Sequence, residues 1–107
     1  MQRIGRVIRL KPECVEEYKR YHANAWPGVL QVIEECHIRN YSLFYHGGML
    51  FSYYEYIGED YPADLARMVT DPRMAEWSRL MQPMMEPLPT RAPGEWFARM
   101  DEVFHTE

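Results

Sequence analysis

The sequence predicts an α+β protein, a βαββαβ chain whose four-stranded antiparallel sheet carries helices on one face. Two observations predict this class. Runs rich in β-branched and aromatic residues alternate with segments of helical apolar spacing, and a glycine pair separates the two central runs. The chain has 107 residues, of which 47% are apolar and 14% aromatic, so we expect a single domain over residues 1–107 with one core.

The first strand is expected over residues 4–10, where Ile4, Ile8 and Leu10 alternate onto one face. A helix begins near Pro12, because proline is favoured in the first turn of a helix. Pro27 interrupts this helix, so a second one is expected after it. The apolar stripes of the two helices consist of Val15, Tyr18, His22 and Trp26, and of Val29, Leu30, Val32, Ile33 and Cys36.

Residues 38–46 and 49–57 read as two strands, and Gly47-Gly48 between them predicts a tight hairpin turn. A helix is expected over residues 62–69. Asp71 is then expected to cap a further helix that begins near Pro72. The apolar face of that helix consists of Met74, Trp77, Leu80 and Met81.

Four prolines between residues 82 and 94 exclude a continuous helix or a central strand, so this segment is expected to be an ordered crossing loop. The last strand is expected over residues 96–105. Helices on one face leave the other face of the sheet uncovered, with Val7, Arg9, Tyr41 and several tyrosines of the third strand as candidates for it. We expect a homodimer, because so apolar a face is rarely left in water.

Charge and composition exclude several classes of partner. The formal charge of −4 opposes a nucleic-acid partner. Arg3, Arg6 and Arg9 are the nearest approach to a basic cluster, and their spacing in a strand puts them on alternating faces. Cys14 and Cys36 lack metal-ligand or redox spacing and are expected to be free thiols. No segment resembles a signal peptide or a membrane span, so we expect no membrane partner and a cytoplasmic location.

Tyr18 and His22 are four residues apart, which places them on one face of a helix. An imidazole and a phenol in one pocket can hold and relay protons, since the pKa of histidine lies near neutral pH. The alternative is that His22 is a structural hydrogen-bonding residue beside aromatic rings. No histidines or cysteines have the spacing of a local metal site, and no phosphate loop, serine elbow or dinucleotide motif occurs.

The aromatic residues favour a sugar ligand. Eight tyrosines and three tryptophans are many for this length. Their rings can stack on the C–H faces of a sugar while phenol and indole groups bond its hydroxyls. Most of these rings are nevertheless expected to belong to the core.

Four segments in order resemble the L-rhamnose mutarotase family: EEYKRYHANAWPGV, RNYSLFY, TDPRMAEWSRLM and MDEVFH. The resemblance covers nearly the whole chain. It implies a ferredoxin-like subunit that pairs into a dimeric α/β barrel. It also implies interconversion of the α and β pyranose forms of a 6-deoxyhexose, L-rhamnose or else L-fucose, without metal or cofactor. The resemblance puts the family's general-acid histidine on His22 and its substrate-contacting tyrosines on Tyr18 and Tyr41.

The resemblance also places a pair of substrate-contacting aromatic residues on Glu76 and Trp77, where this chain departs from the family. If Glu76 points into the site, its carboxylate replaces a stacking ring and can move the preference toward L-fucose. If Glu76 points to solvent, as helical glutamates usually do, it has no such role.

The expected mechanism is acid–base opening and closure of the sugar ring. We expect His22 to protonate the ring oxygen, with Tyr41, Asp101, Glu102 or a water as the opposing base. Two alternatives remain open at this point. The same barrel can carry a cofactor-free monooxygenase or a haem-binding protein, and a sugar-binding module without turnover would need the same pocket.

Overall fold

The computed structural model describes residues 1–107 and contains one antiparallel sheet. Its long strands are β1 (Gln2–Leu10), β2 (Ile38–His46) and β3 (Met49–Tyr56), and two short strands are β4 (Met85–Glu86) and β5 (Ala98–Arg99). The strand order is β2-β3-β1-β4, and β5 pairs with β1 as well. This is the ferredoxin-like α+β arrangement, so the predicted fold class is confirmed.

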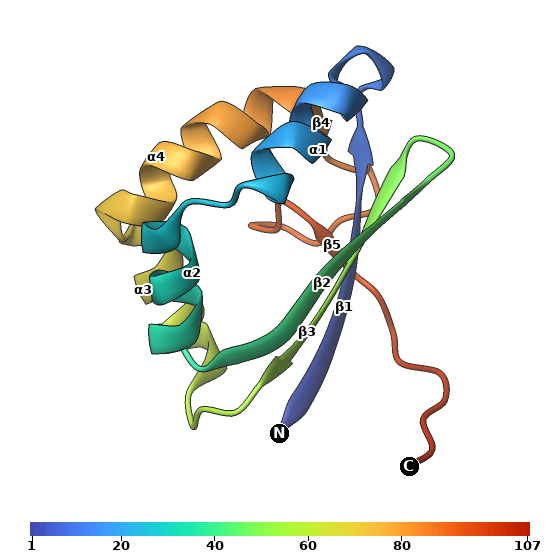
Figure 1. Ribbon diagram of the computed structural model, residues 1–107. Coiled ribbons are helices and arrows are strands. Elements are labelled where there is room, and N and C mark those ends of the chain that lie inside the picture. The colour runs from blue at the N-terminus through green and yellow to red at the C-terminus, as the bar shows by residue number, and fades with distance from the viewer.

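The helices cover one face of the sheet, as Figure 1 shows. They are α1 (Val15–Ala23), α2 (Pro27–Glu35), α3 (Tyr61–Thr70) and α4 (Pro72–Met81), with short 3-10 helices at Pro12–Cys14 and Gln82–Met84. The predicted cap at Asp71 is confirmed: its side chain accepts a hydrogen bond from the Arg73 backbone N–H at 2.9 Å. None of these helices is both long and apolar enough to cross a membrane.

The hairpin between β2 and β3 turns at the two glycines, as predicted. Gly47 and Gly48 have φ values of 56° and 85°, a region that residues with a Cβ rarely adopt. Near the start of β2 the register shifts between Arg39 and Ser42, so that β2 has one extra residue opposite β3. Asn40 lies in this bulge with φ at 53°. Each side chain after the bulge therefore lies on the face opposite to the one that strict alternation from Ile38 would give.

This bulge overturns the predicted position of Tyr41 on the uncovered face. Tyr41 lies on the helix-covered face, where its ring centroid is 5.0 Å from that of Tyr54. Two of the third-strand tyrosines were also misplaced. Tyr54 and Tyr56 are almost completely buried under the helices, and only Tyr53 alternates to the outer face.

The C-terminal third of the chain contains less strand than expected. Of the last strand expected over residues 96–105, only Ala98–Arg99 forms a strand with β1, and residues 101–107 have no regular structure. The predicted crossing loop in turn contains β4, which pairs with the other end of β1. The two short strands share one edge of β1, with β4 beside Arg9–Leu10 and β5 beside Arg6–Val7. Figure 1 shows the C-terminal end leaving the body of the molecule.

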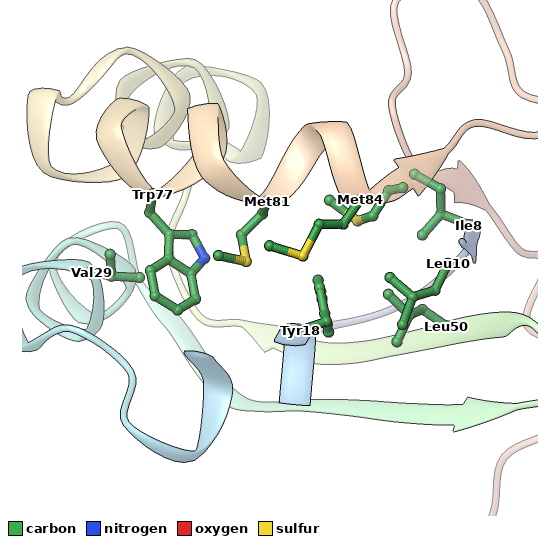
Figure 2. Close-up of a cluster of buried hydrophobic side chains, with 9 residues drawn as sticks. Ile8, Leu10, Tyr18, Val29, Leu50, Trp77, Met81 and Met84 are labelled. Atoms are coloured by element: carbon green, nitrogen blue, oxygen red, sulfur yellow. The ribbon is translucent and has the colours of Figure 1, made fainter. Parts of the chain in front are cut away.

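The core lies between the sheet and the helices. Ile4, Ile8 and Leu10 are at most 2% exposed, which matches the face predicted for them. Figure 2 shows one buried cluster, in which side chains of β1 and β3 meet those of α1, α2 and α4. The outer face carries a row of apolar side chains, since Val7 pairs with Phe51 and Phe51 with Phe44. Phe44 is 63% exposed there.

Candidate active site

A cavity of about 450 Å³ lies between the sheet and the helices. Most of its lining is apolar or aromatic, and a few polar side chains reach it. This composition is typical of sites for small organic ligands. The residues most relevant to chemistry or shape are Arg6, Tyr18, His22, Val29, Tyr41, Leu43, Trp77, Ser78, Met81, Gln82 and Phe97.

His22 contributes a neutral imidazole to this cavity. Its Nδ1 lies 2.8 Å from the backbone carbonyl oxygen of Tyr18, one helical turn earlier. A carbonyl oxygen can only accept, so Nδ1 carries the proton and donates it. Burial lowers the pKa of His22 below its ordinary value of 6.5, although the bond to the Tyr18 carbonyl acts in the opposite direction. Nε2 then carries the lone pair, and it has neither a protein partner nor complete burial.

Tyr18 lies directly against this imidazole. The two ring centroids are 4.1 Å apart with an interplanar angle of 27°, and Tyr18 is only 5% exposed. Burial is the main cause that raises the pKa of the Tyr18 phenol, with the nearby Tyr41 adding to it and Arg6 opposing it. The phenol therefore stays protonated at neutral pH. Its hydroxyl has no protein partner, which leaves it free to bond a ligand.

Trp77 forms an aromatic wall of the cavity from α4. Its ring meets those of Tyr21, His22 and Trp26 edge to face, at centroid distances of 6.0, 5.1 and 5.1 Å. Figure 2 shows Trp77 and Met81 directed from α4 toward the space above Tyr18. Rings of this kind can stack on the C–H face of a small molecule.

Tyr41 and Arg6 form the polar part of the sheet side. Nη2 of Arg6 donates to the Tyr41 hydroxyl at 3.1 Å and to Oγ of Ser52 at 3.4 Å. The guanidinium also lies over the rings of Tyr54 and Phe97, 4.9 and 4.5 Å from their centroids. No carboxylate pairs with Arg6.

Four of the five expected site residues thus line one cavity: Tyr18, His22, Tyr41 and Trp77. Glu76 does not. It is exposed on α4, and its Oε1 accepts a hydrogen bond from Nη2 of Arg79 at 2.7 Å. Of the two orientations weighed for Glu76, the structure has the one toward solvent. The reason is helical geometry, because Trp77 is buried and its sequence neighbour points about 100° away around α4.

Two expected candidates for the opposing base also lie outside the cavity lining. Asp101 is exposed, and Glu102 accepts a hydrogen bond from Nε of Arg3 at 2.8 Å on the outer side of β1. Tyr41 remains as the protein candidate that lines the cavity. Nowhere in the chain do three or more histidine, cysteine, aspartate or glutamate side chains come close enough to hold a metal ion.

Arg6 was missed as a site residue. The signal was present, since Arg6 alternates with Ile4 and Ile8 onto the inner face of β1. A cation at a position flanked by core residues is unusual and points to a polar pocket. Ser78 and Gln82 were missed as well, and the sequence around them carries no comparable signal.

The fold and the cavity define a ferredoxin-like α+β protein with a largely apolar cavity, of the kind that takes small organic ligands, beside a proton-accepting imidazole. The chain belongs to the L-rhamnose mutarotase family, because the family model described as L-rhamnose mutarotase matches residues 3–106. Membership confirms the predicted family and the prediction of an isomerase of the mutarotase type.

Individual relatives agree with this assignment. The chain is 30% identical over 109 residues to an L-rhamnose mutarotase of Lactiplantibacillus plantarum, and all of both chains is covered. It is 34% identical over 97 residues to a UPF0734 protein of Dictyostelium discoideum, which covers 86% of this chain and 78% of that protein. The crystal structure of an L-rhamnose mutarotase from Formosa agariphila matches with a TM-score of 0.78 at 24% identity, over the full length of both chains, and supports the fold.

Proposed function

We propose that this protein interconverts the α and β pyranose anomers of a 6-deoxyhexose, with L-rhamnose as the first candidate and L-fucose as the second. One structural observation supports this activity independently of the family membership. His22 presents an unbonded Nε2 lone pair in a cavity of sugar size, and its other nitrogen is fixed by the Tyr18 carbonyl. Mutarotation requires a positioned group that takes and returns one proton, and this is such a group.

The proposed reaction moves protons between the two oxygens on C1. Nε2 of His22 takes the proton of the anomeric hydroxyl. The electron pair of that O–H bond forms the C1=O bond of the aldehyde as the bond between C1 and the ring oxygen breaks. The ring oxygen keeps the electron pair of the broken bond and receives a proton from the imidazolium. Rotation about C1–C2 and closure on the other face of the aldehyde reverse these steps.

In this scheme His22 begins as the base, whereas the resemblance implies an acid. Burial, which lowers the pKa of His22 despite the opposing effect of the bond to the Tyr18 carbonyl, favours the neutral imidazole at the start, and that bond keeps the proton of the neutral form on Nδ1. The acid role then follows, because the imidazolium formed in the first step protonates the ring oxygen. A positioned group of this kind contributes about 10² to 10⁴ in rate.

The sugar would be held between the aromatic wall and the phenols. Trp77 offers a ring for the apolar side of a deoxysugar, and the Tyr18 hydroxyl is free to donate to a sugar oxygen. The Tyr41 hydroxyl already accepts from Arg6, so it retains its own proton for donation. The absence of a charged Glu76 from the cavity supports L-rhamnose before L-fucose.

We also propose that the protein acts as a homodimer in the cytoplasm. The row Val7–Phe51–Phe44 on the outer sheet face supports the dimer. At the C-terminus, Val103 and Phe104 are 93% and 79% exposed, and a second copy can cover them too. Exposed apolar side chains grouped in this way are typical of a surface that another protein covers.

The test is anomer exchange measured by saturation-difference proton NMR, with L-rhamnose and L-fucose in separate samples. We expect catalytic amounts of the protein to accelerate exchange, and His22→Ala to lower that rate by about 10² or more. His46→Ala is the matched control, since His46 is exposed at the end of β2 and lies outside the cavity.

No acceleration by the folded protein with either sugar would overturn the proposal. Binding of a sugar without faster exchange would favour a binding module. Oxygen consumption or a haem spectrum would favour the alternative enzyme class on the same fold.

A further inference from the structure

Arg6 is the one side chain of the cavity whose charge is left without an opposite charge. It is half-buried on the inner face of β1, and its guanidinium meets two hydroxyls and two aromatic rings but no carboxylate. The other cavity residues include no aspartate or glutamate. Burying a cation in such surroundings is costly unless a partner compensates for it, and an arginine cannot escape the cost by losing its proton.

The hydrogen bonds of the guanidinium are incomplete. Nη2 makes both bonds to protein, to Tyr41 and to Ser52. Nε is sealed from solvent and is the only buried side-chain nitrogen or oxygen in the chain without a partner. Nη1 has no protein partner and is not sealed, so it has donors to offer to a ligand oxygen. The rings of Tyr54 and Phe97, both in contact with the guanidinium, restrict its orientation.

Arg6 and His22 line the same cavity, together with Tyr18 and Tyr41. The Tyr41 hydroxyl accepts a hydrogen bond from Arg6. Both residues also act on the pKa of the Tyr18 phenol, which Tyr41 raises and Arg6 lowers. The His22 ring lies on the other side, stacked on Tyr18. A ligand that fills this cavity can therefore contact both the imidazole and the guanidinium, since both line it.

We propose that Arg6 is a further catalytic residue, whose guanidinium donates to the anomeric oxygen as that oxygen loses its proton to His22. This inference rests on the proposed mutarotase function. When the O–H bond breaks, negative charge grows on the anomeric oxygen until the C1=O bond forms. A preorganised cation stabilises this charge more than it stabilises the neutral sugar. The effect of Arg6 is therefore on the transition state more than on binding.

The experiment measures exchange as a function of sugar concentration for the whole protein, so that kcat and KM are obtained separately. In Arg6→Met, which keeps the length and removes the charge, we expect kcat to fall by about 10² to 10³ with little change in KM. In Arg6→Lys, which keeps a charge without the planar fork, we expect a smaller fall. Arg9→Met is the matched control, because Arg9 lies on the same strand but is exposed on the outer face.

Circular dichroism and thermal melting of each variant show whether it folds. If Arg6→Met does not fold, Arg6→Lys decides: a kcat equal to that of the native protein would overturn the proposal. A rise in KM with unchanged kcat in either variant would also overturn it, since Arg6 would then only bind a ground-state hydroxyl. Absence of exchange with the native protein would instead overturn the proposed function, so the two failures are distinguishable.

Discussion

The imidazole of His22 stacks on the phenol ring of Tyr18 with 4.1 Å between ring centroids, and Nδ1 of the same imidazole bonds the Tyr18 backbone carbonyl at 2.8 Å. One residue thus orients both the plane and the tautomer of the histidine. The arrangement follows from a spacing of four on α1, which brings the side chain of one residue onto the preceding turn. It leaves Nε2 as the single nitrogen available for chemistry.

The pH dependence of activity follows from this arrangement. In the proposed mechanism the active form has neutral His22, and burial lowers the pKa of that imidazole below 6.5. We expect anomer exchange to be constant near neutral pH and to fall as pH drops, with a midpoint below 6.5. The pH profile of kcat/KM measures it, after subtraction of the exchange in protein-free buffer. A midpoint at or above 6.5 would contradict the neutral-base assignment.

The same shift makes His22 a small source of pH-dependent stability. The folded pKa is the lower one, so the unfolded chain binds more protons between the two pKa values. The contribution of His22 to stability is complete above 6.5 and is lost as pH falls toward the folded pKa. Urea titrations give the free energy of unfolding of the native protein and of His22→Gln, whose side chain cannot titrate. As pH falls below 6.5, we expect this free energy to decrease more in the native protein than in the variant.

Removal of the Glu76 carboxylate should leave activity almost unchanged. Glu76 is exposed and bonds Arg79, away from the cavity. We expect Glu76→Gln to change exchange of L-rhamnose and of L-fucose by no more than about twofold, which is the usual scale of a surface substitution. A clear change in the ratio of the two rates would show that Glu76 reaches the sugar.

Asp71 joins the end of α3 to the start of α4, and its ionised carboxylate should stabilise the fold most above acidic pH. Its carboxylate accepts from the side chain and backbone of Arg73, and these bonds lower the pKa of Asp71 to about 2. Because the folded pKa is the lower one, this stabilisation is present above the ordinary value of 3.8 and is lost as pH falls toward 2. We expect Asp71→Ala to lower Tm at pH 7, with Asp71→Asn intermediate. The difference from the native protein should shrink at pH 2 to 3, and an equal loss at all pH values would contradict this account.

The inner face of β1 should be the most sensitive part of the core. Ile8 is fully buried on the central strand. We expect Ile8→Ala to lower the free energy of unfolding by about 2 to 5 kcal/mol, through lost burial and a residual cavity. Ile57→Ala provides the control, because Ile57 is 48% exposed and its truncation should cost little. Urea titrations of the three proteins give these differences.

A charged side chain introduced by substitution on the outer face of the sheet should dissociate the proposed dimer. Phe44 is 63% exposed on the edge strand β2, where it pairs with Phe51 of β3. We expect Phe44→Lys to sediment as a monomer at concentrations where the native protein is a dimer, since a buried unpaired lysine opposes association. Leu80→Lys, on the helical side of the molecule, should remain a dimer. A native protein that sediments as a monomer would refute the dimer itself.

Much of the fold was predictable because its signals are local. Proline and aspartate mark the starts of the helices, paired glycines mark the hairpin, and alternation marks the buried face of β1. The pairing of Tyr18 with His22 is equally local, since it depends on spacing along one helix. The last strand was less predictable because pairing with the edge of β1 is long-range: β4 occupies that edge at Arg9–Leu10, so β5 begins only at Ala98, opposite Val7.

The residues of the sequence therefore determined the elements, the inner face of β1 and the imidazole–phenol pair on α1. Only the tertiary structure decided which side chains share the cavity. The bulge at Asn40 turned Tyr41 to the inner face, and the packing of Trp77 against α1 and the Trp26 segment turned Glu76 to solvent. The physical reason is that a bulge and a helix rotation are settled by long-range pairing and burial, and these cannot be read from spacing along one segment.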